Sequence, residues 1–253
     1  MLRIYALSCG SLEFDRNLFF PESAAGERIV TPVSSYLIVH PQGKVLFDTG
    51  IHCDALSDPM ARLGKRVASL FELRSKRGED VVSQLALLGI RPDEIRYVVN
   101  SHFHFDHCGC NASFPRAAFL AQRAELAAAR AEPRRYNAKD WDHALDYREI
   151  DGEHDLFGDG TLVLLPTPGH TPGHQSLWLR PGPGAQFVLT SDACYTQEHL
   201  EKRILPAAVH DAAQMTDSMQ MLRGLRERQG VELLYGHDAG QWRAMPHAPK
   251  PLL

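Results

Sequence analysis

The sequence has no long hydrophobic run and only five cysteines. No stretch approaches the roughly 18 uncharged apolar residues that a membrane-spanning helix needs, so we expect no membrane partner. The first residues lack the charged start, the long apolar core and the small-residue cleavage site of a secretory signal. Five cysteines are an odd number without a disulfide framework, which favours reduced thiols and a cytoplasmic location.

The sequence also lacks a concentration of basic residues. It contains 27 Lys and Arg against 31 Asp and Glu, a net charge of −4, whereas a nucleic-acid-binding surface needs a basic stripe or patch. The nearest candidate is the short run at 133–135, which is followed by Asp140 and Asp142. We therefore predict that nucleic acid is not a partner.

Nothing in the sequence divides the chain into separate units. At 253 residues, with 44% hydrophobic and 23% charged residues, it has the composition of an ordinary globular protein. Internal repeats and low-complexity linkers are absent from the sequence, so we predict one domain over residues 1–253. The Pro and Gly cluster at 181–184 predicts a tight turn between two strands rather than a domain boundary.

Two kinds of periodicity predict the secondary structure. Runs rich in Val, Ile, Leu and aromatic residues predict strands at 2–7, 34–39, 44–47, 96–100, 162–165, 175–179, 187–189 and 232–234. Apolar residues three and four apart predict helices at 78–88, 122–131 and 210–229. Strands dominate early and alternate with helices later, which favours an α/β fold of two sheets flanked by helices.

The segment 132–147 differs from its surroundings. It is polar, only weakly periodic, and contains Tyr136, Trp141 and Tyr147. Such a segment suits a loop or short helices over a cleft. Its aromatic residues either pack beneath it or face a substrate, and the sequence leaves both interpretations open.

The most chemically informative stretch is SHFHFDH at 101–107. It places three histidines and one aspartate within six positions, namely His102, His104, Asp106 and His107. A strand end that runs into a turn can aim all four inward, and their nitrogen and oxygen donors suit zinc, iron, manganese or cobalt. Because a single catalytic zinc typically takes three protein ligands, the surplus suggests two metals in one site.

Three further His or Asp residues follow predicted strands. His170 follows the strand at 162–165, Asp192 follows 187–189, and His237 follows 232–234. A buried strand that ends in Gly plus His or Asp can hold a metal ligand on a rigid support. Together with the first motif, these residues predict a metal site built at strand ends.

These motifs resemble those of the metallo-β-lactamase superfamily, and within it the N-acyl homoserine lactonases, which are quorum-quenching enzymes. SHFHFDH, TPGHTPGHQSL and SDACYT carry the resemblance, including Tyr195 three positions after Asp192. It extends over nearly the whole chain, from Tyr36 and Asp48 to His237. The resemblance implies an αββα sandwich with a dinuclear site at one edge, in agreement with the two sheets predicted above.

The resemblance also implies how the ligands divide between two divalent ions, with zinc expected first and iron, cobalt or manganese as alternatives. The implied ligands are His102, His104 and His170 on one ion, Asp106, His107 and His237 on the other, and Asp192 between them. His174 is implied to be a neighbour of the ligands rather than a ligand. Asp48 is implied to be a carboxylate that orients them.

The chain departs from the family pattern directly after the first motif. The family often has two glycines there, whereas this chain has Cys108, Gly109 and Cys110. A metal-binding or redox role for these cysteines stays open, but small buried packing residues are the better interpretation. Cys194 is expected to pack as well, because Asp192 already supplies the bridging carboxylate.

The implied reaction is the opening of a homoserine lactone ring. Two divalent ions lower the pKa of a shared water toward about 7, and the resulting hydroxide attacks the carbonyl carbon. Tyr195 is the expected donor to the carbonyl oxygen, and the alternative is a buried phenol bonded to backbone. Asp106 is the expected acid–base group for the leaving alkoxide.

The acyl chain of such a substrate would need an apolar groove. The candidates for its walls are Leu18, Phe19, Phe20 and Phe105, together with aromatic residues of 132–147, and we predict that Phe20 and Phe105 bind the substrate. Because Phe19 and Phe20 are adjacent, only one of them can face the cleft in an extended chain. The preferred acyl length stays open at this point, as do the native metals and whether the chain forms a homodimer.

Other activities of the superfamily compete with this one. Glyoxalase II-type thioesterases normally add a helical region, for which residues 238–253 are too few. RNA-processing relatives should be larger or more basic, and flavodiiron-type oxidoreductases would place Glu at position 104. Other lactone, carboxylester, sulfonate-ester, phosphotriester and β-lactam hydrolysis stays open, because the same hydroxide serves all of them. A non-catalytic metal sensor is disfavoured, because every implied ligand and Tyr195 is present.

Overall fold

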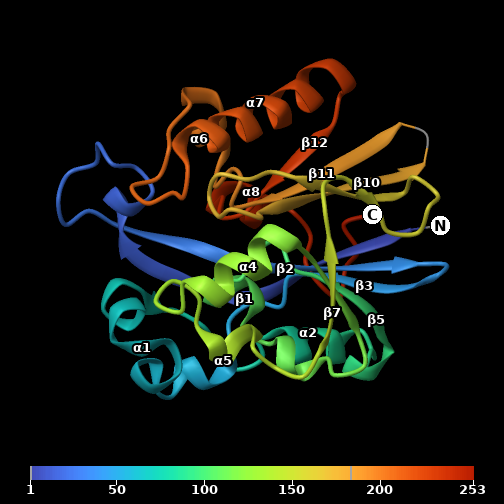
Figure 1. Ribbon diagram of the computed structural model, residues 1–253, viewed down its shortest axis with the longest axis horizontal. Helices are drawn as coiled ribbons and strands as arrows, with labels where there is room; N and C mark the ends of the chain where they lie inside the picture. Colours follow the sequence, from blue (N-terminus) through green and yellow to red (C-terminus); the bar gives the residue numbers. More distant parts are fainter. Residues whose placement is uncertain (1, 183) are drawn as a thin grey trace.

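The computed structural model describes residues 2–182 and 184–253. These residues form two mixed β-sheets that lie face to face between layers of helices (Figure 1). The larger sheet has seven strands in the order β4-β1-β2-β3-β5-β6-β7, and the smaller has five in the order β12-β11-β10-β9-β8. The αββα sandwich implied by the resemblance is thereby confirmed.

The larger sheet changes from antiparallel to parallel pairing across its width. Its strands are β1 (Arg3–Asp15), β2 (Arg28–His40), β3 (Gly43–Phe47), β4 (Glu72–Leu73), β5 (Ile95–Val99), β6 (Ala118–Gln122) and β7 (Asp146–Ile150). β4, β1, β2 and β3 pair antiparallel, whereas β3, β5, β6 and β7 run parallel. The parallel part brings several strand carboxyl ends to one edge, where sites in α/β proteins are commonly built.

The smaller sheet is mainly antiparallel. Its strands are β8 (His154–Asp155), β9 (Leu162–Pro166), β10 (Gln175–Gly182), β11 (Ala185–Ser191) and β12 (Glu232–Tyr235). Only the β11–β12 pair is parallel among these strands. The predicted turn at 181–184 falls where β10 passes into β11, although Pro183 itself lies outside the described residues.

Helices cover the outer faces of both sheets. They are α1 (Pro59–Leu70), α2 (Val81–Leu87), α3 (Phe105–Cys108), α4 (Arg123–Ala131), α5 (Ala138–Trp141), α6 (Gln197–Lys202), α7 (Ala212–Gln229) and α8 (Ala239–Ala244), with 3₁₀ helices at Arg16–Leu18, Cys53–Leu56, Pro92–Glu94 and Asn111–Ser113. α7 packs on the smaller sheet and α2 on the larger one, at opposite sides of the molecule (Figure 1). Within the described ranges, no helix has the length and apolarity needed to cross a membrane.

An apolar core fills the space between the two sheets. Ile4, Val45 and Val99 of the larger sheet pack in one cluster with Leu164 and Leu177 of the smaller sheet, and all five are fully buried. Burying a side chain of this size stabilises a fold by about 1.5–3 kcal/mol. This core holds the strand ends of both sheets in constant relative positions, which a multi-loop site requires.

The predicted elements are all present, and the structure adds others. The eight predicted strands correspond to β1, β2, β3, β5, β9, β10, β11 and β12, and the three predicted helices to α2, α4 and α7. Strands β4, β6, β7 and β8 were not predicted, and neither were helices α1, α3, α6 and α8. The segment 132–147 contains the short helix α5, and its Tyr136 and Trp141 are buried beneath it.

Candidate metal centre

The predicted metal ligands come together at one edge of the sandwich. β5 ends at Val99, and the chain then turns through 100–104 into the short helix α3. The segments after β9, β11 and β12 supply one residue each. The resulting donors form a first group, His102, His104, His170 and Asp192, and a second group, Asp106, His107 and His237.

In the first group, three imidazole nitrogens converge. His104 Nδ1 lies 3.0 Å from Nε2 of His102 and 3.0 Å from Nε2 of His170. One ring nitrogen has a single lone pair or a single proton, so it cannot pair well with both neighbours. Nitrogen ligands of a tetrahedral zinc are about 3.3 Å from one another, which matches this spacing.

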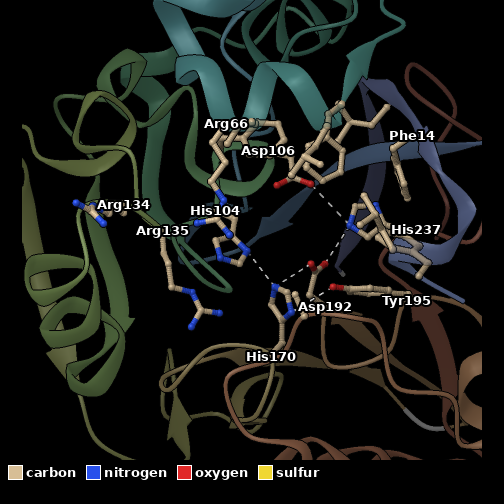
Figure 2. A pocket seen from close by; sticks show the side chains of 18 residues that line it. Phe14, Arg66, His104, Asp106, Arg134, Arg135, His170, Asp192, Tyr195 and His237 are labelled. Atoms are coloured by element: carbon tan, nitrogen blue, oxygen red, sulfur yellow. Dashed lines mark hydrogen bonds and ion pairs between the residues drawn. The ribbon is translucent and has the colours of Figure 1, made fainter. Parts of the chain in front are cut away.

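Asp192 connects the two groups through its two carboxylate oxygens. Its Oδ2 lies 3.2 Å from His170 Nε2 in the first group. Its Oδ1 lies 3.1 Å from His237 Nε2 and 3.2 Å from His107 Nε2 in the second group. Figure 2 shows Asp192 between His170 and His237, as a bridging ligand would lie.

Among the described residues, two buried polar atoms that face each other at the second group have no hydrogen-bond partner. They are His107 Nε2 and Asp192 Oδ1. Leaving a buried donor or acceptor unsatisfied costs about 1–3 kcal/mol. A cation held between these atoms, with Asp106 Oδ2 3.5 Å from His107 Nε2, would satisfy both. The donor set therefore fits a divalent ion.

The electrostatics of the site also favour bound cations. Asp48, Asp106 and Asp192 are three buried carboxylates within it, and buried carboxylates are costly unless they are paired. Burial lowers the pKa of His104 to about 4, so the first group offers a neutral imidazole, the form that binds metal. Burial alone would also lower the pKa of His107, but the charge of Asp192 and the other carboxylates raises it well above its usual range. The second group thus attracts positive charge.

Asp48 orients His107 of the second group, which is the kind of role that the resemblance implied. Its Oδ2 is 2.9 Å from His107 Nδ1, and its Oδ1 accepts a hydrogen bond from the backbone N–H of Ser101 at 2.7 Å. A carboxylate in this position sets the tautomer of the imidazole and directs its other nitrogen toward the metal.

Two further rings are oriented in the same way. His237 Nδ1 lies 2.9 Å from the backbone oxygen of Pro32. His170 Nδ1 lies 3.2 Å from the hydroxyl of Tyr195. In both cases the Nε2 atom is left to face the donor groups.

His174 lies beside the site but outside both donor groups. Its Nε2 accepts a hydrogen bond from the backbone N–H of Asp192 at 3.1 Å, and its Nδ1 is 2.8 Å from Thr167 Oγ1. Both ring nitrogens are therefore occupied. His174 positions the backbone of Asp192, which agrees with its implied role as a neighbour.

The cysteines near the site pack rather than face it. Cys108, Cys110 and Cys194 are buried, and each thiol contacts a backbone carbonyl. Burial raises the pKa of Cys194 to about 12 and that of Cys108 well above its usual range. The packing interpretation of these residues therefore fits the structure better than a ligand or redox role.

A cavity of about 210 Å³ opens onto both donor groups. Its polar floor consists of His104, Asp106, His170, Asp192, Tyr195 and His237. Its apolar wall consists of Leu12, Phe14, Leu18, Phe19, Val67, Leu70, Phe71, Phe105 and Ala208. Arg66, Arg134 and Arg135 also line the cavity (Figure 2).

The expectation for Phe20 needs correction. Phe105 lines the cavity, whereas Phe20 packs on His199 with ring centroids 4.4 Å apart and lines a separate surface groove. Phe19 takes the place in the cavity wall, and its ring lies 4.1 Å from that of Tyr195. Both phenylalanines directly follow the 3₁₀ turn at Arg16–Leu18, and only Phe19 of the two lines the cavity.

Several cavity residues have no signal in the sequence. Phe14 lies on β1, Val67 and Arg66 on α1, and Phe71 directly after α1. None of them belongs to a motif, and they meet only through the packing of distant segments. Arg135 lies in the 132–147 segment, whose polarity did indicate a cleft-covering role.

A comparison with family models supports the architecture and the site together. Residues 28–237 match the model of the metallo-beta-lactamase superfamily. This range contains both donor groups, from His102 to His237. The fold and the donor groups therefore define a protein of the metallo-β-lactamase type.

Individual relatives narrow the assignment. The chain is 34% identical to the N-acyl homoserine lactonase AttM of Azorhizobium caulinodans, over 98% of this chain and 97% of that protein. It is 29% identical to the N-acyl homoserine lactonase AiiA of Bacillus thuringiensis subsp. kurstaki, over 94% of each chain. A solved N-acyl homoserine lactone hydrolase with the product N-hexanoyl-L-homoserine at its catalytic metal center has 28% identity, a TM-score of 0.90 and 98% coverage of both chains. The chain belongs to the metallo-beta-lactamase superfamily and, within it, to the N-acyl homoserine lactonase family.

Proposed function

We propose that this protein opens the lactone ring of N-acyl homoserine lactones with the help of two divalent metal ions. The observation that carries the proposal is the pair of donor groups sharing Asp192 at the floor of an apolar cavity. A ring ester suits the polar floor, and an acyl chain suits the apolar wall. Zinc is the expected metal because imidazole and carboxylate are its usual catalytic ligands, while iron, cobalt and manganese accept the same donors.

Each donor group is proposed to hold one ion. The proposed ligands are His102, His104 and His170 for the first ion, Asp106, His107 and His237 for the second, and Asp192 for both. Bound divalent ions supply a hydroxide nucleophile near neutral pH and polarise the carbonyl of the ester.

Tyr195 is proposed to donate a hydrogen bond to the carbonyl oxygen as it gains charge. If His170 Nε2 faces the metal, its Nδ1 carries the proton and donates to the Tyr195 hydroxyl 3.2 Å away. The phenol then keeps its own proton for the substrate. Burial and the charge of Asp192 raise the pKa of Tyr195 well above its usual value, so it stays protonated.

Asp106 is proposed to transfer the proton that the leaving alkoxide needs. Its carboxylate lines the cavity, and it also belongs to the second donor group. Its carboxylate can therefore approach the ring oxygen of a bound substrate while it remains part of the second donor group. Hydrolysis ends with a carboxylate and an alcohol in place of the ring ester.

The remaining proposals concern the protein as a whole. Residues 1–253 are proposed to act as one domain, because one apolar cluster joins the two sheets. The cytoplasm is the proposed location, because all five cysteines are free thiols in the structure. The proposed partner is the small lactone itself.

A substrate panel tests the proposed reaction. Protein of measured metal content should open butyryl and decanoyl homoserine lactones in preference to a thioester, a phosphotriester and a β-lactam. Ring opening releases an acid and can be followed by pH change or by chromatography of the product. Protein that carries two metals per chain and opens neither lactone would overturn the proposal.

Tyr195→Phe should lower kcat by about 10²-fold or more, because removal of one oxyanion donor typically costs that much. Metal content and KM should change little, since the phenyl ring of the variant would still fill the cavity wall. If Tyr195 served only to orient His170, the variant would instead lose metal affinity and keep kcat at saturating metal. Steady-state kinetics and metal analysis on the same preparation separate these two roles.

Phe105→Ala should raise KM for decanoyl homoserine lactone by about tenfold relative to butyryl, because a lost apolar contact of this kind is worth about 1–3 kcal/mol. Phe20→Ala is the matched control, since Phe20 lies outside the cavity. The control should leave the ratio of the two KM values unchanged. A larger effect from Phe20→Ala than from Phe105→Ala would refute this placement of the acyl chain.

A further inference from the structure

Glu125 is a buried carboxylate that the proposed reaction does not use. It lies in the first turn of α4 and is only 1% exposed. Its Oε1 accepts a hydrogen bond from the backbone N–H of Phe103 at 3.1 Å. Its Oε2 accepts one from the backbone N–H of Gly173 at 3.0 Å. One carboxylate thus joins two segments that are far apart in the sequence.

Those two segments carry all three histidines of the first donor group. Phe103 lies between His102 and His104, and Gly173 follows His170 by three positions. Their nitrogens converge on His104 Nδ1 at 3.0 Å, so a small shift of either segment would open this group. Two hydrogen bonds from one buried side chain fix the separation of the two backbone segments that carry these histidines.

Gly173 packs directly against the backbone of Glu125. A Cβ atom at this position would lie 2.2 Å from the backbone nitrogen of Glu125. Only glycine lets the His170 segment rest directly on the first turn of α4. The carboxylate and the glycine together form a built junction between this segment and the helix.

A neighbouring ring extends the junction to His104. The ring of Tyr136 stacks on that of His104, with centroids 5.6 Å apart and planes 28° apart. Burial raises the pKa of Tyr136, and the charge of Glu125 raises it further. By contrast, the second group is oriented by Asp48 and by the backbone of Pro32.

We propose that Glu125 is a positioning residue for the first metal ion and not for the second. It holds the two segments at the separation at which the three histidines converge. This inference rests on the proposed two-metal function. Replacing the carboxylate with an amide leaves one oxygen acceptor and directs an NH₂ group at the other backbone N–H, so one of the two segments loses its anchor.

The test is a titration of metal-free Glu125→Gln with cobalt(II), followed by absorbance and elemental analysis. The affinity for one of the two ions should fall by about 10–100-fold, the usual effect of losing a contact that orients metal ligands. The affinity for the other ion should stay within about twofold of the original protein. Raising the metal concentration should restore kcat, which a general folding defect would not allow.

Asp155→Asn is the matched control. Asp155 also accepts hydrogen bonds from backbone N–H groups, those of Phe157, Gly158 and Gly160, but it does so in the turn between β8 and β9. The same carboxylate-to-amide change there should leave both metal affinities unchanged. An equal fall in both affinities in Glu125→Gln, or no fall in either, would overturn the inference.

Gly173→Ala provides an independent variant if Glu125→Gln does not fold. Its added methyl group separates the His170 segment from α4 while the carboxylate is kept, so it should show the same selective loss of one ion. Retention of both ions at full affinity in a folded Gly173→Ala protein would count against the inference. Because the titration needs no substrate, two bound ions without lactone opening would overturn the proposed reaction and leave the role of Glu125 standing.

Discussion

Asp192→Ala is expected to weaken both metal ions at once and to lower kcat/KM for lactone opening by at least about 10³-fold. Its Oδ2 faces His170 and its Oδ1 faces His237, at 3.2 and 3.1 Å. Among the described residues, Asp192 is the proposed ligand with one carboxylate oxygen directed at the first donor group and the other at the second. Without bound ions, the pKa of water returns from about 7 to 15.7, so hydroxide becomes scarce at neutral pH.

The measurement is the number of metal ions per chain after desalting, with kinetics on the same sample. His104→Ala removes a residue of the first group alone, so it should lose one ion and retain the other. Cys194→Ala is the control, because Cys194 is buried two positions from Asp192 and lies outside both donor groups. Two tightly bound ions in Asp192→Ala would contradict its bridging role.

The donor groups could be predicted because their chemistry is concentrated in short stretches of sequence. Four of the donors lie within 102–107, and each of the others lies one to four positions after the end of a strand formed by an apolar run. Strand ends are rigid and meet at one edge, so proximity in space follows from the fold class. The neighbouring residue Glu125 gave no such signal, because a single glutamate at the start of a helix is ordinary.

The cavity wall was harder to predict than its floor. Phe14 and Val67 come from two segments that meet the predicted wall residue Phe105 only in the folded chain. The choice between Phe19 and Phe20 depends on one turn of 3₁₀ helix, which hydrophobic periodicity does not reveal. Contacts of this kind depend on tertiary packing, whereas the metal ligands depend on residue type.

The missed strands have similar physical reasons. β7 is an edge strand whose residues are partly or fully exposed, so it lacks the apolar alternation of an inner strand. β6 is uniformly buried and runs directly into α4, so its apolar residues merge with those of the helix. β1 continues to Asp15, well beyond its apolar start, through an irregularity between Ser8 and Ser11.

Removal of the metal ions should both abolish lactone opening and destabilise the folded chain. The donor groups and Asp48 bury three carboxylates, whose charges the cations are proposed to balance. A ligand present at 100 times its Kd stabilises the folded state by about 2.7 kcal/mol. For a chain of this size, 1 kcal/mol corresponds to about 2–4 °C in Tm, so loss of two such ions should lower Tm by roughly 10–20 °C.

Thermal unfolding of the chelated protein, before and after addition of zinc, cobalt, manganese or iron(II), checks this expectation. The metals that restore Tm should be the same ones that restore activity. In Asp192→Ala, Tm should change little on adding metal at concentrations that saturate the original protein. The carboxylates raise the pKa values of His107 and His237. An unchanged Tm after chelation would mean that protons on these two imidazoles balance the charge of the buried carboxylates without any metal ion. In that case Tm should instead fall as the pH rises and these imidazoles lose their protons, because a raised pKa stabilises the folded state only while the group stays protonated.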